Sequence, residues 1–160
     1  MNFRVGIGYD VHQLITGRPL VLGGVTIPHH VGLSGHSDAD VLVHAVMDAL
    51  LGAAGLGDIG RLFPDTDPRY RGANSLELLR RVGCLLAEQG WRVINVDAVV
   101  VAEEPRLAPY LSLMRERMAR ALDVDEGRVH VKATTTEGLG FAGQRRGMAA
   151  YATCLLAGRE

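Results

Sequence analysis

Every second residue from Phe3 to Tyr9 is apolar, and the positions between them carry arginine or glycine. This two-residue period is typical of a β-strand, so we predict a strand over residues 3–9. Further on, Gly23-Gly24 separates two short apolar runs. A glycine pair readily adopts the positive φ values of a two-residue turn. Residues 20–27 are therefore predicted to form a small hairpin.

Three stretches have the apolar spacing of amphipathic helices. The first covers residues 38–54 and is followed by several glycines. The second begins at the cap residue Asn74, which has a glutamate three positions later, and it ends at Gly90. The third spans residues 105–122, and its arginines at positions 115, 117 and 120 lie toward its C-terminal end, where the helix dipole favours positive charge.

Three further segments complete the predicted sheet. Residues 91–102 and 129–133 read as strands, and the glycine-rich stretch 134–146 reads as a loop. Residues 148–157 fit a helix or a strand, and the need for a sheet partner favours a strand. The whole chain is thus predicted to be a single α/β (α+β) domain over residues 1–160, with a mixed four-stranded sheet layered against helices and a small N-terminal hairpin.

The composition argues against polymer or membrane binding. The chain has 160 residues with 17 basic and 18 acidic side chains, so its formal net charge is −1. It lacks the basic run of a nucleic-acid-binding protein, an apolar stretch near the ~20 residues of a bilayer span, and a secretory signal pattern. We expect a cytoplasmic protein whose two cysteines, Cys84 and Cys154, are buried reduced thiols.

One group of side chains has the composition of a metal site. Asp10 and His12 lie two residues apart at a strand end, so they share a face, and His44 lies within the first helix. One carboxylate and two imidazoles form a donor set of catalytic zinc, which leaves a fourth position open. Asp40 or Asp48, one turn on either side, is expected to orient His44. The alternative is that Asp10 only caps a turn, His12 lies on the surface, and His44 is a half-buried histidine whose hydrogen bonds are satisfied.

Other polar segments suit a phosphorylated ligand. Residues 36–40 run into the first helix, whose free N–H groups bind anions, although Ser37 or Asp38 also suits an ordinary cap. Residues 134–137 offer three hydroxyls and a carboxylate for phosphate and a hard cation, but threonine runs also occur in plain strands. Residues 58–67 fit either a loop that closes over a polar ligand or a solvated turn.

Two common nucleotide motifs are missing from the sequence. There is no G-x-x-x-x-G-K-[ST] segment, and Gly6-Ile7-Gly8 lacks the third glycine and following helix of a dinucleotide-binding fold. Three histidines, His29, His30 and His130, have no carboxylate or histidine at ligand spacing. We interpret them as structural or exposed.

In their order and spacing, the motifs resemble the 2-C-methyl-D-erythritol 2,4-cyclodiphosphate synthase family of the non-mevalonate isoprenoid pathway. The resemblance covers the whole chain and rests on Tyr9-Asp10-Val11-His12, His36-Ser37-Asp38, His44-Ala45, residues 57–68 and Lys132-Ala133-Thr134-Thr135-Thr136-Glu137. It implies a lyase that is a homotrimer of α/β subunits, with an active site in each cleft between neighbours.

The resemblance also implies roles for individual residues. Zinc is expected on Asp10, His12 and His44, magnesium or manganese at Glu137, and transition-state stabilisation from His36 and Thr135. The residues expected at the methylerythritol phosphate end are Asp10, His12, His36, Ser37, Asp58, Ile59, Gly60, Phe63, Pro64, Asp65, Thr66 and Asp67. Those expected at the cytidine end, from the neighbouring subunit, are Ala102, Glu103, Glu104, Pro105, Arg106, Leu107, Ala108, Thr134, Thr135, Thr136 and Glu137. Phe141 is also expected to contact the substrate.

The implied reaction converts 4-diphosphocytidyl-2-C-methyl-D-erythritol 2-phosphate to the 2,4-cyclodiphosphate. The 2-phosphate attacks the β-phosphorus of the same molecule, and CMP leaves. Two alternatives stay open at this point. The first is a zinc-dependent phosphohydrolase, because three protein ligands with an open fourth position also suit an activated water. The second is a non-catalytic trimer that binds isoprenoid diphosphates and whose zinc has only a structural role.

One segment departs from the family pattern. Members commonly read Gly-Arg-Gly-Glu-Gly where this chain has Gly143-Gln144-Arg145-Arg146-Gly147. In the family, that arginine helps to bind an isoprenoid diphosphate on the trimer axis. Our hypothesis is that Arg146 compensates for Gln144, because three copies would place positive charge around the axis.

Overall fold

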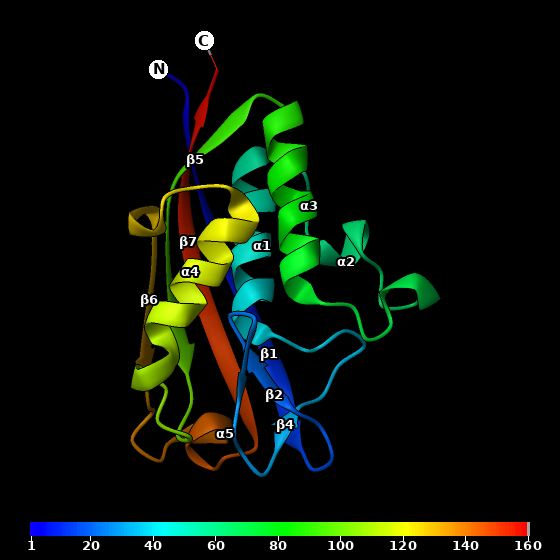
Figure 1. Cartoon of the computed structure of the whole chain (residues 1–160), viewed down its shortest axis with the longest axis vertical. Helices are drawn as coiled ribbons and strands as arrows, with labels where there is room; N and C mark the ends of the chain where they lie inside the picture. The colour runs from blue at the N-terminus through cyan, green and yellow to red at the C-terminus, as the bar shows by residue number, and fades with distance from the viewer. Residues whose placement is uncertain (160) are drawn as a thin grey trace.

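The computed structural model describes residues 1–159 as one sheet with helices packed on one of its faces (Figure 1). The sheet has five strands in the order β4-β1-β7-β5-β6, and β2 and β3 form a separate hairpin. The strands are β1 (Phe3–Ile15), β2 (Leu20–Leu22), β3 (Val25–Ile27), β4 (Gly32–Leu33), β5 (Trp91–Val101), β6 (Val129–Thr134) and β7 (Gly147–Gly158). Only the β5–β6 pair is parallel among the pairs of this sheet in residues 1–159.

Three long helices and two single-turn helices connect the strands. They are α1 (Val41–Ala54), α2 (Ile59–Leu62), α3 (Ser75–Glu88), α4 (Leu111–Leu122) and α5 (Gly140–Gly143). Short 3₁₀ turns occur at Pro68–Tyr70, Ala108–Tyr110 and Glu126–Arg128. Within residues 1–159, no helix is long and apolar enough to cross a membrane.

The mixed sheet, the hairpin and the strand at the C-terminus are confirmed, and the count of four strands is wrong. The strand that was not predicted is β4, which has two residues and pairs with Leu14 and Ile15 of β1. It exists because β1 continues to Ile15 instead of ending at residue 9. After Tyr9, the polar residues Asp10, His12 and Gln13 enter the strand, but the backbone keeps its antiparallel ladder with β7 as far as Gln13. A two-residue strand is also too short to show a period.

Several boundaries also differ from the sequence-based expectations. The third helix begins at Leu111 instead of residue 105, after the 3₁₀ turn at Ala108–Tyr110. The segments 58–67 and 134–146 each contain one helical turn, α2 and α5, where only loop was expected. In α2, the side chain of Asp58 accepts a hydrogen bond from the Arg61 N–H and so starts the turn.

Helix α1 packs directly onto β1 because two glycines face it. A Cβ atom built on Gly8 would lie 1.9 Å from the carbonyl oxygen of Ala45, and one on Gly6 would lie 1.9 Å from that of Ala49. No real Cβ tolerates such a distance, so only glycine allows this approach. The close contact also places His44, on α1, beside Asp10 and His12 of β1.

Five large apolar residues of β1 point away from this core. Phe3, Val5, Ile7, Tyr9 and Val11 are exposed, Val5 by 76% and Ile7 by 73%, and Tyr151 on the neighbouring strand β7 is exposed beside them. Monomeric proteins rarely leave such a contiguous apolar surface in water. We call this surface, made by the five β1 residues and Tyr151, the open sheet face.

Candidate active site

Asp10, His12 and His44 converge on one point, as the sequence predicted. Asp10 Oδ2 lies 2.9 Å from His12 Nε2 and 3.0 Å from His44 Nδ1, and the two nitrogens are 3.2 Å apart. Three ligands bound about 2.0–2.1 Å from one tetrahedral ion would be roughly 3.3–3.4 Å apart. The triangle therefore has nearly the size that a bound divalent metal requires.

The far side of each imidazole ring is held by a hydrogen bond. His12 Nδ1 lies 2.8 Å from the carbonyl oxygen of Ser34. A carbonyl oxygen only accepts, so this nitrogen carries the proton and Nε2 presents its lone pair to the triangle. Partners of this kind fix both the tautomer and the ring orientation of a metal-binding histidine.

His44 is held by two serine hydroxyls instead of the expected carboxylates. Its Nε2 lies 3.2 Å from Ser37 Oγ and 3.0 Å from Ser75 Oγ, and Ser75 in turn donates its hydroxyl proton to Asp38. Sequence reasoning missed Ser75. Its position at the start of α3 marks it as part of a helix cap, and only the fold shows that it is fully buried beside His44.

The prediction that Asp40 or Asp48 orients His44 is wrong. Asp40 is the N-cap of α1, and its carboxylate accepts hydrogen bonds from the N–H groups of Val43, Gly23 and Gly24. Asp48 accepts from the Ile59 N–H at the start of α2. Both residues lie one helical turn from His44, but their carboxylates accept hydrogen bonds from backbone N–H groups and not from the His44 ring.

The electrostatics of the triangle favour a cation at its centre. Burial raises the pKa of Asp10, but hydrogen bonds and charge from His12 and His44 outweigh this effect and lower the pKa from 3.8 to about 2. Burial lowers the pKa of His44, and Asp10 more than reverses that effect, so the net shift is upward. The negative charge of Asp10, which raises the pKa of His44, would also attract a divalent cation to this point.

The triangle opens into a cavity of about 350 Å³. Of the residues expected at the methylerythritol phosphate end, the cavity brings together Asp10, His12, His36, Ser37, Ile59, Gly60, Phe63 and Asp65, and its lining also contains Gly35, His44, Met47, Tyr70 and Leu78. His36 Nε2 lies 3.0 Å from the carbonyl oxygen of Asp67, which positions its ring. Asp58, Pro64, Thr66 and Asp67 belong to the same segment but do not line the cavity.

The residues expected at the cytidine end form a separate group. The Ala102 N–H donates to the Thr134 carbonyl oxygen, and the carboxylate of Glu103 accepts from the N–H groups of Thr136 and Gly138. These contacts join the turn after β5 to the turn after β6. None of these residues, nor Phe141, lines the 350 Å³ cavity. The two groups of predicted site residues therefore do not share this cavity within one chain.

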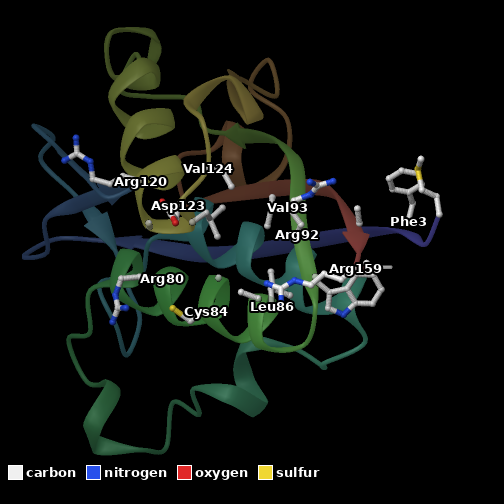
Figure 2. A pocket seen from close by; sticks show the side chains of 18 residues that line it. Phe3, Arg80, Cys84, Leu86, Arg92, Val93, Arg120, Asp123, Val124 and Arg159 are labelled. Atoms are coloured by element: carbon white, nitrogen blue, oxygen red, sulfur yellow. The ribbon is translucent and has the colours of Figure 1, made fainter.

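A larger hollow than this cavity lies elsewhere on the described surface. It measures about 1020 Å³ and lies between α3, the end of α4 and the start of β5 (Figure 2). Arg80, Arg92, Arg120 and Arg159 line it, but its lining lacks histidines and the three-donor triangle. Cys84 is in this lining and is exposed, so the expectation of two buried thiols is wrong for Cys84 and confirmed for Cys154.

Comparison with known proteins decides the family. A model described as the YgbB family matches residues 3–157. The chain belongs to the YgbB family. A 2-C-methyl-D-erythritol 2,4-cyclodiphosphate synthase of Pelotomaculum thermopropionicum is 65% identical to this YgbB-family chain over 153 residues, which are 96% of the chain and 94% of the relative. A synthase of the same name from Symbiobacterium thermophilum is 63% identical over 97% of the chain and 99% of the relative.

Solved structures show the same YgbB-family fold. The bifunctional IspDF of Campylobacter jejuni matches with a TM-score of 0.95 and 47% identity, over 99% of this chain and 43% of that one. The IspF of Plasmodium falciparum, solved as a CDP complex, matches with a TM-score of 0.87 and 33% identity, over 99% and 98% of the two chains. The mixed α/β architecture is therefore that of known IspF proteins.

Proposed function

We propose that the chain is a cyclodiphosphate synthase that converts 4-diphosphocytidyl-2-C-methyl-D-erythritol 2-phosphate to 2-C-methyl-D-erythritol 2,4-cyclodiphosphate and CMP. The observation that carries this proposal is the Asp10–His12–His44 triangle at the wall of a polar cavity, in a chain 65% identical to a synthase of that name. The enzyme is a lyase, because a phosphate of the substrate itself displaces CMP and no water is consumed.

In this proposal, Asp10, His12 and His44 hold a zinc ion. When bound, the ion would polarise phosphate oxygens and offset their negative charge. The Ser34 carbonyl and the hydroxyls of Ser37 and Ser75 keep the two rings aimed at the ion. The methylerythritol phosphate end of the substrate lies in the adjoining cavity, against those of its predicted residues that line the cavity wall.

The second half of the site is supplied by a neighbouring copy of the chain. The open sheet face supports this proposal, because a large exposed apolar surface indicates a subunit interface, and a homotrimer with shared clefts would bring the two halves together. In each cleft, the segments 102–108 and 134–137 of the neighbour hold the cytidine diphosphate end. Phe141 borders it, and Glu137 binds a magnesium or manganese ion.

The reaction forms one P–O bond and breaks another. An oxygen of the 2-phosphate attacks the β-phosphorus, and the bond from that phosphorus to the bridging oxygen breaks, so CMP leaves with that oxygen. His36 and Thr135 donate hydrogen bonds to the charge that develops in the transition state. Alignment of the two reacting groups within one molecule can lower the barrier by ~7–11 kcal/mol. No general base is needed, because the attacking phosphate is already ionised near neutral pH.

We extend the proposal to a regulatory ligand on the trimer axis. Arg146 is exposed and lies next to β7, a neighbour of β1 in the sheet. Three copies of Arg146 would bind the diphosphate of an isoprenoid in place of the arginine that Gln144 replaces. Calorimetry with geranyl diphosphate should give saturable heat that is lost in Arg146→Gln. The absence of heat at millimolar ligand would contradict the extension.

The test of the main proposal is product identification by phosphorus NMR. The purified protein, incubated with the substrate and magnesium, should yield the cyclic diphosphate and CMP. Turnover should stop with a zinc chelator and in His44→Ala, and it should persist in His130→Gln, a control on the exposed side of β6. Release of inorganic phosphate would instead indicate a phosphohydrolase. Retained zinc without turnover would indicate a binding protein.

A further inference from the structure

A second group of metal-ligating side chains lies outside the Asp10–His12–His44 triangle. His29 and His30 are in the connection between β3 and β4, and Glu104 follows β5. One donor atom from each of the three lies within 4.8 Å of the others. Sequence spacing did not reveal this group, because the carboxylate comes from a distant part of the chain. The interpretation of His29 and His30 as merely structural or exposed is therefore incomplete.

One atom of this group is buried and has no partner. His29 Nε2 is shielded from solvent and makes no hydrogen bond within residues 1–159. Buried polar atoms are nearly always satisfied, so each exception needs an explanation. The His30 ring does not supply the missing hydrogen bond. The two imidazole rings pack edge to face, with an interplanar angle of 61° and centroids 4.4 Å apart. A metal ion would use the lone pair of this nitrogen directly.

The ion pair between Glu104 and Arg145 leaves room for a metal ion. Arg145 Nε lies 3.4 Å from Glu104 Oε2, and the Arg145 side chain is 61% exposed. An exposed ion pair of this kind is weak. A carboxylate has two oxygens, so Glu104 can bind a metal ion with one oxygen and keep Arg145 at the other.

We propose that His29, His30 and Glu104 form a second site for a borderline divalent cation, represented by Zn²⁺. Two imidazoles and one carboxylate are donors that this class of ion prefers. Ligands of one tetrahedral ion lie roughly 3.4 Å apart, so a small rotation of the exposed His30 side chain would complete the geometry. The ion would join the β3–β4 connection to the turn that contains Glu104 and Pro105.

Zinc stoichiometry tests the site without reference to turnover. Untagged protein is dialysed to equilibrium against Zn²⁺ in magnesium-containing buffer, and bound zinc is measured by mass spectrometry. Wild type and the control His130→Gln should bind two Zn²⁺ per chain, and His30→Gln and His44→Ala one each. The double variant should bind none. Turnover should be unchanged in His30→Gln.

The location of the ion provides the second readout. Diffraction data from zinc-soaked wild-type crystals, collected above the zinc absorption edge, should show an anomalous peak beside His29 Nε2 and another inside the triangle. The proposal is overturned if His30→Gln binds as much zinc as wild type, or if the only peak lies in the triangle. Because the two sites are read separately, failure of the second site leaves the triangle and the proposed reaction untouched.

Discussion

His44 depends on its serine partners as well as on the two other corners of the triangle. Ser75 Oγ lies 3.0 Å from His44 Nε2 and is fully buried. Loss of a partner behind a metal-binding histidine typically lowers metal affinity by about 10–100-fold. We expect a loss of this size in Ser75→Ala, measured by competition with a zinc chelator. Ser112→Ala, on the exposed side of α4, is the matched control. Equal affinity in the two variants would contradict this role.

Asp40 should give the folding stability a distinctive pH dependence. Burial and the charge of Asp38 raise the pKa of Asp40 from 3.8 to about 6, against the lowering effect of three backbone hydrogen bonds. A carboxyl with a raised pKa in the folded state favours folding while protonated, so its contribution is full below pH ~3.8 and is lost as pH rises through about 6. Over this range, wild type should lose on the order of 1–3 kcal/mol of unfolding free energy relative to Asp40→Asn.

Denaturant titrations of wild type and Asp40→Asn between pH 4 and 7 measure this difference. The variant also loses an acceptor for a backbone N–H, which lowers its stability at every pH. The prediction therefore concerns only the slope with pH. Parallel curves would show that Asp40 is not the titrating group.

At the residue scale, the three corners of the triangle were predictable and their supports were not. Asp10 and His12 share a strand face by their spacing, and His44 completes a donor set whose chemistry is specific. The supporting groups are Ser75 and the Ser34 carbonyl, and they reach the rings only through the fold. The same limit applies to His29, whose carboxylate neighbour Glu104 lies far along the chain.

At the scale of elements, the contact between β1 and α1 positions the triangle. Gly8→Ala would place a Cβ atom 1.9 Å from the Ala45 carbonyl oxygen and force the helix away from the strand. We expect a loss of about 3 kcal/mol or more in unfolding free energy, together with weaker zinc binding. Gly52→Ala is the control within α1, because nothing lies within 4 Å of its added Cβ. It should stabilise the protein by about 1 kcal/mol. Equal effects of the two changes in thermal unfolding would contradict this account.

Periodicity and caps predicted most elements, including the Gly23-Gly24 hairpin and the helix that begins after Asn74. They failed where the pattern changes within an element. In β1, Asp10 and His12 follow the glycines on the core-facing side, and the alternation of apolar residues ends at Val11, before the strand does. The segment 58–67 was expected to be a loop, but its Asp58 cap starts a helical turn.

At the scale of the whole molecule, the account requires several copies of the chain. Ile7 is 73% exposed in the middle of the open sheet face. Ile7→Glu should convert a trimer into monomers in analytical ultracentrifugation and abolish turnover, although it lies outside the cavity. Leu113→Glu changes an exposed leucine on α4 and should leave both properties intact. A trimeric Ile7→Glu would show that the open sheet face is not the interface.

The assembly was the part that patterns of residues alone did not predict. An alternating strand is normally taken to bury its apolar side, yet in β1 the glycines face the core and the large apolar side chains face outward. The expectation of a homotrimer came from the resemblance. In the proposed function, the open sheet face would form the contact between copies, and the assembly would bring the two groups of predicted site residues together.

The central claim is that a phosphate oxygen of the substrate, and not water, attacks the β-phosphorus. Turnover in ¹⁸O-enriched water, followed by mass spectrometry of the products, tests it most directly. The account predicts cyclic diphosphate and CMP that both lack solvent-derived ¹⁸O. One solvent ¹⁸O atom in a phosphate of either product would contradict the account, because it would identify water as the nucleophile.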